Sequence, residues 1–173
     1  MKALLLTLAL MASACQATES ILVIGDSISF ASNSWANQWR DQGNRNLKLL
    51  AQSGRAVVDY DIPRDLLPYL GIVDVYYALG SNDIGREEHP GQVNFYLRQH
   101  IDSLVARGFQ VTLVIPPRFE HSDRIRALYP PLCAKVARCV DLQDIWHAVE
   151  TSDGVHPTTA GQLVILEHLI PPS

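Results

Sequence analysis

Short apolar segments alternate along the chain with longer segments of helical periodicity. We predict β-strands at residues 21–24, 47–51, 73–79, 111–115 and 139–142. Their apolar residues are nearly continuous rather than alternating with polar ones, which is typical of parallel strands covered on both faces. The pattern therefore predicts strands at the centre of a layered α/β structure.

The segments between these strands are predicted to contain helices. We expect them within residues 35–40, 62–70, 92–107, 123–137 and 158–170. Apolar side chains recur on one face of the third segment, and the glycine directly after it is expected to end that helix. Two consecutive prolines must start, kink or split the fourth. This alternation predicts one domain, a three-layer α/β/α sandwich with a central parallel five-stranded sheet.

The N-terminal segment differs in composition from the rest of the chain. A lysine is followed by an apolar run and then by small residues, all within residues 2–14. This order is that of a secretory signal peptide. We therefore expect residues 1–17 to be a signal peptide, cleaved after Ala14 or Ala17, and residues 18–173 to form a single domain that is secreted or periplasmic.

The cysteines bear on the state of the mature chain. Cys15 follows small residues in a pattern similar to a bacterial lipobox, so a lipid anchor at Cys15 stays open beside ordinary cleavage. Cys133 and Cys139 then remain, and in an oxidising compartment two thiols at this short spacing favour a disulfide. Two separately buried thiols are the alternative.

Composition excludes several classes of partner. The 173 residues include 14 basic and 18 acidic side chains, a formal net charge of −4, and no block of basic residues. We therefore expect no nucleic-acid partner. No segment approaches the roughly 20 consecutive apolar residues that span a bilayer, and no second Cys or His pair has metal-ligand spacing. Neither a transmembrane segment nor a metal ion is expected.

Polar side chains follow several of the predicted strands. In parallel strands the loops at the carboxyl ends meet at one edge of the sheet, where open α/β sheets place their functional sites. The loops contain "GDS" with Ser27, "SGR" with Gly54, "GSND" with Asn82, and "DGVHP" with Asp153 and His156. We therefore expect these residues to lie together.

Acyl transfer needs each of these residue types. A serine hydroxyl is a weak nucleophile until a base removes its proton, and His156 is the candidate base for Ser27. Asp153, three residues before this histidine, can hold its tautomer and stabilise the imidazolium. The tetrahedral oxyanion requires fixed hydrogen-bond donors. The candidates are the backbone N–H groups of Ser27 and Gly54 and the side-chain amide of Asn82.

The four blocks, in this order, resemble those of the SGNH hydrolases, which are also called GDSL esterases and lipases. The resemblance implies that Ser27 is the nucleophile and that Asp153 and His156 complete a catalytic triad. It places Gly54 and Asn82 in the oxyanion hole beside the Ser27 N–H. It also implies a flavodoxin-like α/β/α fold, a shallow exposed site and no cofactor. The Gly-x-Ser-x-Gly motif of the α/β-hydrolases, which share the chain order Ser, Asp, His, is absent from the sequence.

The leading functional hypothesis is a serine esterase that hydrolyses carboxylic ester bonds through an acyl-enzyme. We expect a small-molecule or glycan ester with small O-acyl groups such as acetyl. The chain has no obvious lid insertion and no long apolar loop near the expected site, which argues against a long-chain lipase. A lysophospholipase or acyl-thioesterase is the alternative among enzymes, with Phe30, Trp35 and Ile84 as candidate acyl-pocket residues. A non-catalytic glycan-binding module is the alternative from another class. Ordinary surface roles are predicted for His89, His100, His121, His147 and His168.

Overall fold

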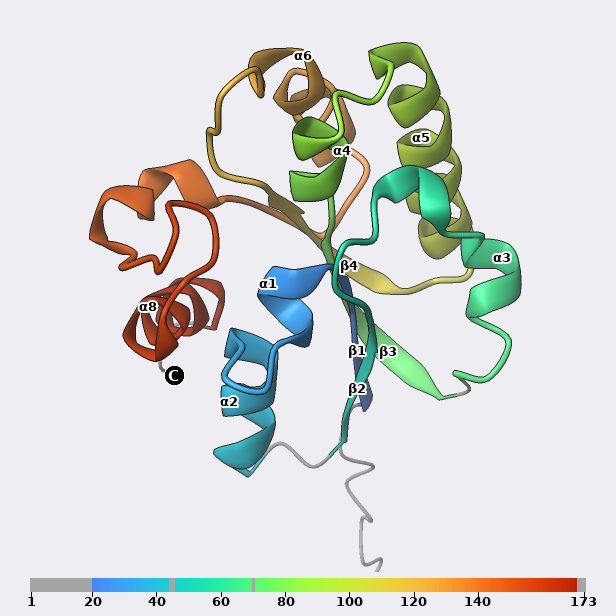
Figure 1. Cartoon of the computed structure of the whole chain (residues 1–173). Helices are drawn as coiled ribbons and strands as arrows, with labels where there is room; N and C mark the ends of the chain where they lie inside the picture. Colours follow the sequence, from blue (N-terminus) through green and yellow to red (C-terminus); the bar gives the residue numbers. More distant parts are fainter. Residues whose placement is uncertain (1–19, 44–45, 70, 171–173) are drawn as a thin grey trace, which may run out of the picture.

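The computed structural model describes residues 20–43, 46–69 and 71–170 (Figure 1). The predicted signal peptide, with both cleavage positions and Cys15, lies outside these residues. Across the described ranges, no helix combines the length and the apolar character needed to cross a membrane.

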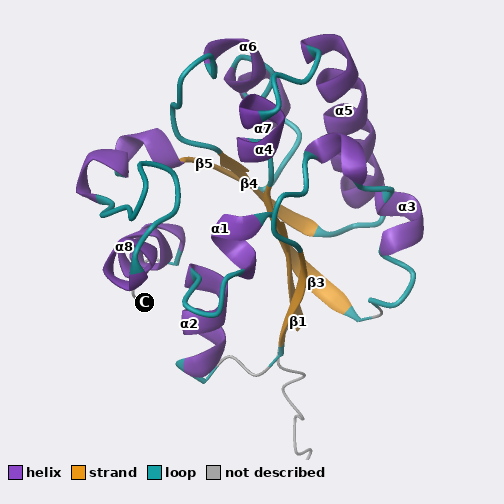
Figure 2. Ribbon diagram, viewed as in Figure 1, coloured by secondary structure: helices purple, strands orange, loops and turns teal. Residues whose placement is uncertain are grey.

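A sheet of parallel strands, orange in Figure 2, forms the centre of the fold. Its five strands lie in the order β2-β1-β3-β4-β5. The strands are β1 (Ser20–Gly25), β2 (Leu47–Ala51), β3 (Ile72–Ala78), β4 (Gln110–Ile115) and β5 (Arg138–Asp141). Each end lies within one residue of the predicted one. The predicted five-stranded parallel sheet is therefore confirmed.

The order of the strands creates a switch point beside β1. The chain passes from β1 to β2 on one side and then returns to β3 on the other side of β1. In open α/β sheets, a crevice forms at the carboxyl ends of the strands where the order reverses. Gly25, at the end of β1, is paired in register with Ala78, at the end of β3. The loops that lead to Ser27 and Asn82 therefore leave the sheet side by side.

Helices cover both faces of the sheet, as Figure 1 shows. They are α1 (Ser27–Phe30), α2 (Trp35–Asp41), α3 (Ile62–Asp65), α4 (Ser81–Gly85), α5 (Pro90–Ala106), α6 (Asp123–Arg126), α7 (Pro130–Cys133) and α8 (Thr159–Leu169), with short 3-10 helices η1 (Val57–Asp59), η2 (Leu142–Asp144) and η3 (Trp146–Ala148). One core joins α2 and α8 to the sheet face that carries Val23 and Val140. The other joins α3, α5, α6 and α7 to the face that carries Leu22 and Leu113. Side chains alternate between the faces along each strand, so the two cores give the predicted three layers.

Prolines shorten two of the predicted helices. The helix predicted at residues 62–70 ends after Asp65, because Pro68 lacks an N–H and disfavours the helical conformation in the residue before it. The helix predicted at residues 123–137 is split into α6 and α7, and Pro130 begins the second of them.

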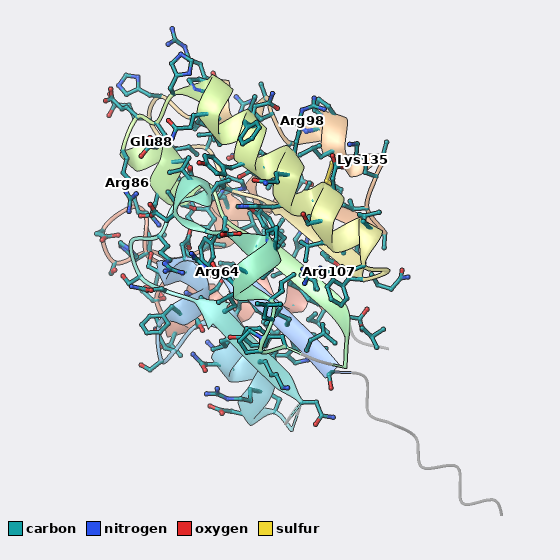
Figure 3. The ribbon with its side chains drawn as sticks, turned by 90° about the vertical axis from the view of Figure 1, so that its right-hand side faces the viewer. Arg64, Arg86, Glu88, Arg98, Arg107 and Lys135 are labelled. Carbon is teal, nitrogen blue, oxygen red and sulfur yellow. A yellow bond between two sulfur atoms is a disulfide. The ribbon has the colours of Figure 1, made fainter. Side chains whose placement is uncertain are left out.

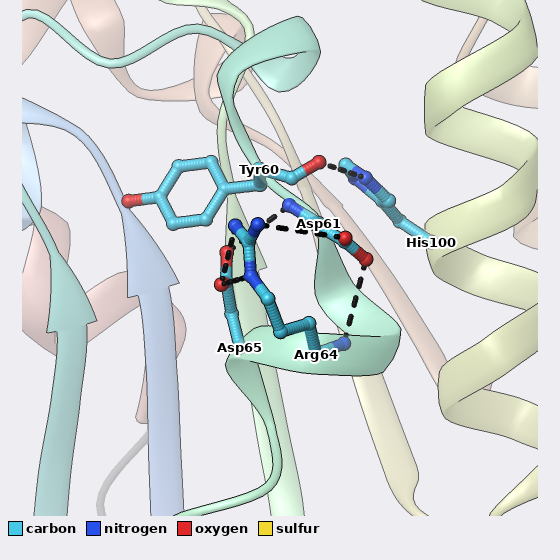
Figure 4. A network of polar contacts seen from close by, with 5 residues as sticks. All are labelled: Tyr60, Asp61, Arg64, Asp65 and His100. Carbon is cyan, nitrogen blue, oxygen red and sulfur yellow. Dashed lines mark hydrogen bonds and ion pairs between the residues drawn. The ribbon is translucent and has the colours of Figure 1, made fainter.

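The predicted surface role of His100 is wrong. Its side chain is fully buried in the core that contains α5. Its Nε2 donates to the carbonyl oxygen of Tyr60 at 3.1 Å (Figure 4), and its Nδ1 lies 2.8 Å from the Tyr77 hydroxyl. Burial lowers the pKa of His100 to about 4, so the ring is neutral and joins α5 to the segment before α3. The other four histidines are exposed or partly exposed: His89, His121, His147 and His168.

Cys133 and Cys139 form a disulfide, with an S–S distance of 2.06 Å. The bond joins the end of α7 to β5. The predicted pairing is confirmed, and two separate thiols are excluded.

Candidate active site

Ser27 is displayed at the junction between β1 and α1. The Asp26 side chain caps α1 by accepting a hydrogen bond of 3.0 Å from the Ile28 N–H. A side chain at Gly25 would bring its Cβ within 2.5 Å of the Ser29 Oγ, so this turn requires glycine. The "GDS" segment is thus a tight strand-to-helix turn with Ser27 as the first helical residue.

His156 lies against Ser27, although the two are 129 positions apart in the chain. The Ser27 Oγ is 3.2 Å from the His156 Nε2, which is hydrogen-bonding distance. On the other side of the ring, Nδ1 is 2.7 Å from Oδ2 of Asp153. The Nδ1 proton is therefore directed to the carboxylate, and Nε2 is left to accept the serine proton.

Asp153 also accepts hydrogen bonds from the backbone of its own loop. Its Oδ1 accepts from the N–H of His156 at 2.7 Å and from the N–H of Val155 at 3.0 Å. These bonds, of which the His156 N–H contributes most, hold the pKa of the Asp153 carboxyl well below its usual range. The carboxylate therefore remains ionised at mildly acidic pH and can stabilise positive charge on the ring.

Hydrogen bonds join the two ends of the loop that contains Asp153 and His156, just before α8. The His156 carbonyl oxygen accepts from the backbone N–H of Ser152 at 2.9 Å and from its hydroxyl at 3.1 Å. Two residues further on, the Thr158 N–H donates to the Glu150 carbonyl oxygen at 2.9 Å. The two side chains are nevertheless half exposed, at 50% for His156 and 54% for Asp153. The backbone of the site is therefore held by hydrogen bonds, and its side chains are open to solvent.

Asn82 lies in α4, shortly after β3. Its side-chain amide donates to the carbonyl oxygen of Arg55 at 2.9 Å, which uses one of the two N–H groups of the amide. Asn82 also lines the cleft that contains Ser27 and His156. The second N–H of the amide is the candidate oxyanion donor.

Gly54 lies in the loop after β2, at a backbone φ of +77° that favours glycine. The Arg86 guanidinium donates to the Gly54 carbonyl oxygen and also pairs with Asp59 at 2.9 Å. Together with the Asn82–Arg55 bond, these contacts fasten the Gly54 loop to α4 and to the residue that follows it. Within the described part of the chain, the lining of the cleft includes Asn82 and leaves out Gly54.

Asp83 and Arg86 are residues of the site region that sequence reasoning missed. Asp83 is buried, and its Oδ2 accepts a hydrogen bond of 2.8 Å from the N–H of Val57, beyond the Gly54 loop. Burial raises the pKa of Asp83 to about 6 and also raises that of Asp26 to about 6. The position of Asp83 in "GSND" was an available signal, whereas nothing in the sequence pairs Arg86 with a loop 32 residues earlier.

The cleft around Ser27 has a volume of about 590 Å³. Residues 118–121, in the loop after β4, line this cleft together with residues of α4. Of the three candidate acyl-pocket residues, Ile84 lines this cleft, whereas Trp35 is buried in the core and Phe30 is 49% exposed and outside the cleft lining. Across the described ranges, no group of three or more His, Cys, Asp or Glu side chains is placed to hold a metal ion.

The structure is similar to solved structures of several esterases and lipolytic proteins. The psychrotrophic esterase EstA from Pseudoalteromonas sp. matches with a TM-score of 0.71 and 20% identity, over 87% of this chain and 94% of that chain. The acetyl xylan esterase AlAXEase matches with a TM-score of 0.71 and 14% identity, over 87% of this chain and 97% of that chain. A member of the lipolytic protein G-D-S-L family from Veillonella parvula matches with a TM-score of 0.70 and 14% identity, over 87% of this chain and 95% of that chain.

No protein-family model and no curated protein matches the sequence. The structural likeness spans most of the chain at low sequence identity, so what it establishes is the fold. The chain has the α/β/α fold of the SGNH, or GDSL, hydrolases, as its four sequence blocks predicted.

Proposed function

We propose that the protein is a serine esterase that hydrolyses carboxylic ester bonds through an acyl-enzyme intermediate. One observation carries the proposal: Ser27, His156 and Asp153 form a continuous hydrogen-bonded chain at the carboxyl edge of the sheet. A binding module has no need of such a chain, whereas a serine nucleophile requires it. The esterases among the structural neighbours support the same reaction class.

The reaction follows from the positions of these side chains. His156 Nε2 takes the proton of the Ser27 hydroxyl as Oγ attacks the ester carbonyl carbon, and the carbonyl oxygen becomes an oxyanion. The Asn82 amide, with the backbone N–H groups of Ser27 and Gly54, is proposed to stabilise that charge. When the tetrahedral species collapses, the C–O bond breaks and His156 returns its proton to the departing alcohol. A water molecule, deprotonated by the same ring, then releases the acid and restores Ser27.

For the substrate, we propose small O-acyl groups such as acetyl, carried by a small molecule or a glycan. The apolar lining of the cleft around Ser27 is limited to a few side chains, among them Ile84, Phe119 and Val155, and charged residues surround them. A long acyl chain would leave much apolar surface in water at this open site. A lysophospholipase or acyl-thioesterase is the second candidate, because the Ile84 side chain supplies some apolar contact beside the nucleophile.

We also propose that the protein works outside the cytoplasm, in a secreted or periplasmic form. The Cys133–Cys139 disulfide supports this location, since disulfides persist in oxidising compartments. The proposal further relies on the signal-peptide pattern of residues 1–17.

Covalent labelling tests the proposed function. An organophosphonate ester should add its phosphonyl group to Ser27, as peptide mass spectrometry would show, and should abolish hydrolysis of short-chain esters. Ser27→Ala should neither be labelled nor hydrolyse esters. Ser103→Ala, in α5 on the opposite edge of the sheet, should behave as the wild type. An unlabelled wild-type protein that binds glycan without hydrolysing esters would establish the binding-module alternative instead.

A further inference from the structure

A second hollow, of about 470 Å³, adjoins the cleft that contains Ser27. It lies between the segment that joins α4 to α5 and the start of α6. Ile84, Glu87 and His121 line both the cleft and this second hollow. These three residues therefore form the divide between the two.

Glu87 and His121, at the divide, share an unusual backbone conformation. Their φ angles are 53° and 60°, and within the described part of the chain they are the non-glycine residues with positive φ. A residue with a side chain adopts this region at a cost in free energy, and such residues cluster at functional sites. Both side chains are exposed, so the strained backbone presents polar groups to the solvent side of the divide rather than to the core.

The walls of the second hollow carry complementary polar groups. Glu87, Glu88 and His89 line one side of the hollow, and His121 and Arg124 line the other. The His121 Nε2 also lies 3.4 Å from the Glu120 carboxylate. Arg86 lies 4.0 Å from Glu88, at the same edge of the molecule (Figure 3), and offsets part of its negative charge. Hydroxyl groups, which both donate and accept, suit such a surface. An alkyl chain would exclude water from these polar groups and offer them no hydrogen bond in exchange.

We propose that the second hollow binds the alcohol part of the ester, that this part is a hydroxylated group such as a sugar, and that Glu87 and His121 select it. The inference rests on the esterase function proposed above. When the ester carbon lies at Ser27, the acyl and alcohol parts extend in opposite directions from it. The divide is the point at which the alcohol part passes from the cleft into the second hollow, so Glu87 and His121 contact it beyond the reacting bond.

A comparison of two acetyl esters that differ only in their alcohol part separates this role from the chemistry at Ser27. One is a disaccharide with a single acetyl group and its other hydroxyls free, and the other is hexyl acetate. Glu87→Gly and His121→Gly remove the side chains while keeping the backbone, because glycine adopts positive φ without strain. Glu87→Gln removes only the charge, and Glu167→Gln, at an exposed position of α8, is its matched control.

The wild type should prefer the sugar ester. In both glycine variants the ratio of kcat/KM for the sugar ester to kcat/KM for hexyl acetate should fall by about tenfold, mainly through KM, because hydrogen bonds to the hydroxyls are lost. Glu167→Gln should leave the ratio at its wild-type value. A wild type that prefers hexyl acetate, or glycine variants with an unchanged ratio, would overturn the second hollow as an alcohol site. Hydrolysis of neither ester by the wild type, together with no labelling of Ser27, would instead overturn the esterase proposal.

Discussion

The side-chain amide of Asn82 donates a hydrogen bond of 2.9 Å to the carbonyl oxygen of Arg55. The bond joins α4 to the loop that contains Gly54, and so connects the two segments that supply candidate oxyanion donors. It also restrains the amide, because one of its two N–H groups is held by the protein. An amide that is restrained before the reaction would be an effective donor to a developing negative charge, as proposed for Asn82.

Asn82→Ala should lower kcat for acetyl esters by roughly 10²-fold or more, with little change in KM, because a donor to the transition state is lost. Steady-state kinetics with a short-chain ester would measure both constants. Far-ultraviolet circular dichroism of the same preparation checks that the variant folds. A raised KM with kcat preserved would make Asn82 a substrate-binding residue, and the oxyanion would need another donor.

Arg86→Ala should lower kcat by about tenfold at nearly constant KM, because it releases the Gly54 carbonyl and shifts that loop without touching the substrate. Arg86→Lys should restore only part of the activity, since an ammonium cannot bond Gly54 and Asp59 with the geometry of a guanidinium. The matched control is Arg98→Ala in α5, where the side chain bonds Asn94 at 3.0 Å (Figure 3). Equal losses in the Arg86 and Arg98 variants would contradict a positioning role for Arg86.

The sequence was sufficient to predict the sheet and the proximity of Ser27, His156 and Asp153, because both depend on local patterns. Apolar runs located each strand, and parallel strands place their following loops at one edge. Ser27, Asn82 and His156 could therefore be assigned to one site from three separate loops. The prediction needed no knowledge of side-chain packing.

The remaining features depend on the conformation of irregular segments, which periodicity does not describe. The Gly54 carbonyl that Arg86 bonds lies in an irregular loop, at a residue with positive φ. The strained backbone of Glu87 and His121 is set by the contacts of their loops, and neither residue type marks a left-handed position in the sequence. The burial of His100, in contrast, could have been predicted, because His100 lies three residues after Leu97 on the buried face of α5. The helical spacing there already indicated burial.

Replacing both Cys133 and Cys139 by serine should lower the free energy of unfolding by about 2 kcal/mol, because a closed loop of this size restricts the unfolded chain. Urea unfolding of the oxidised wild type and of the double variant would give the difference. Adding a reductant should shift the wild-type midpoint towards that of the variant and leave the variant where it is. A wild-type midpoint that does not respond to the reductant would contradict the stabilising role.

Asp83→Asn should change how stability depends on pH. Burial raises the pKa of Asp83 from 3.8 to about 6, so the folded state binds more protons than the unfolded state between these values. The stability of the wild type must then fall as pH rises from about 4 to about 6. The asparagine side chain keeps an oxygen for the Val57 N–H but cannot ionise, so the stability of the variant should fall less over this pH range. At pH 7 the free energy of unfolding of the variant should exceed that of the wild type by up to roughly 3 kcal/mol.

Urea unfolding at a series of pH values would measure the effect of Asp83→Asn. Asp26, with a pKa also raised to about 6, remains in the variant and should keep part of the pH dependence. The control is Asp102→Asn, which removes an exposed carboxylate paired with Lys135 at 2.7 Å. If the free energy of unfolding changed as steeply with pH in Asp83→Asn as in the wild type between pH 4 and pH 6, Asp83 would not be held in its protonated form.

Asp153→Asn should lower kcat by about 10³-fold or more, because an amide nitrogen cannot accept the Nδ1 proton and the ring turns to the wrong tautomer. In the wild type, kcat/KM should rise with pH, because the proposed mechanism needs a neutral imidazole to take the Ser27 proton. Hydrogen bonds hold the pKa of the Asp153 carboxyl well below its usual range, so the protonation of Asp153 contributes nothing to this rise. A pH-stat assay with an alkyl acetate, whose leaving group does not ionise, would record the profile. A flat profile between pH 5 and pH 9 would mean that no histidine base operates at Ser27, and the esterase mechanism would fail with it.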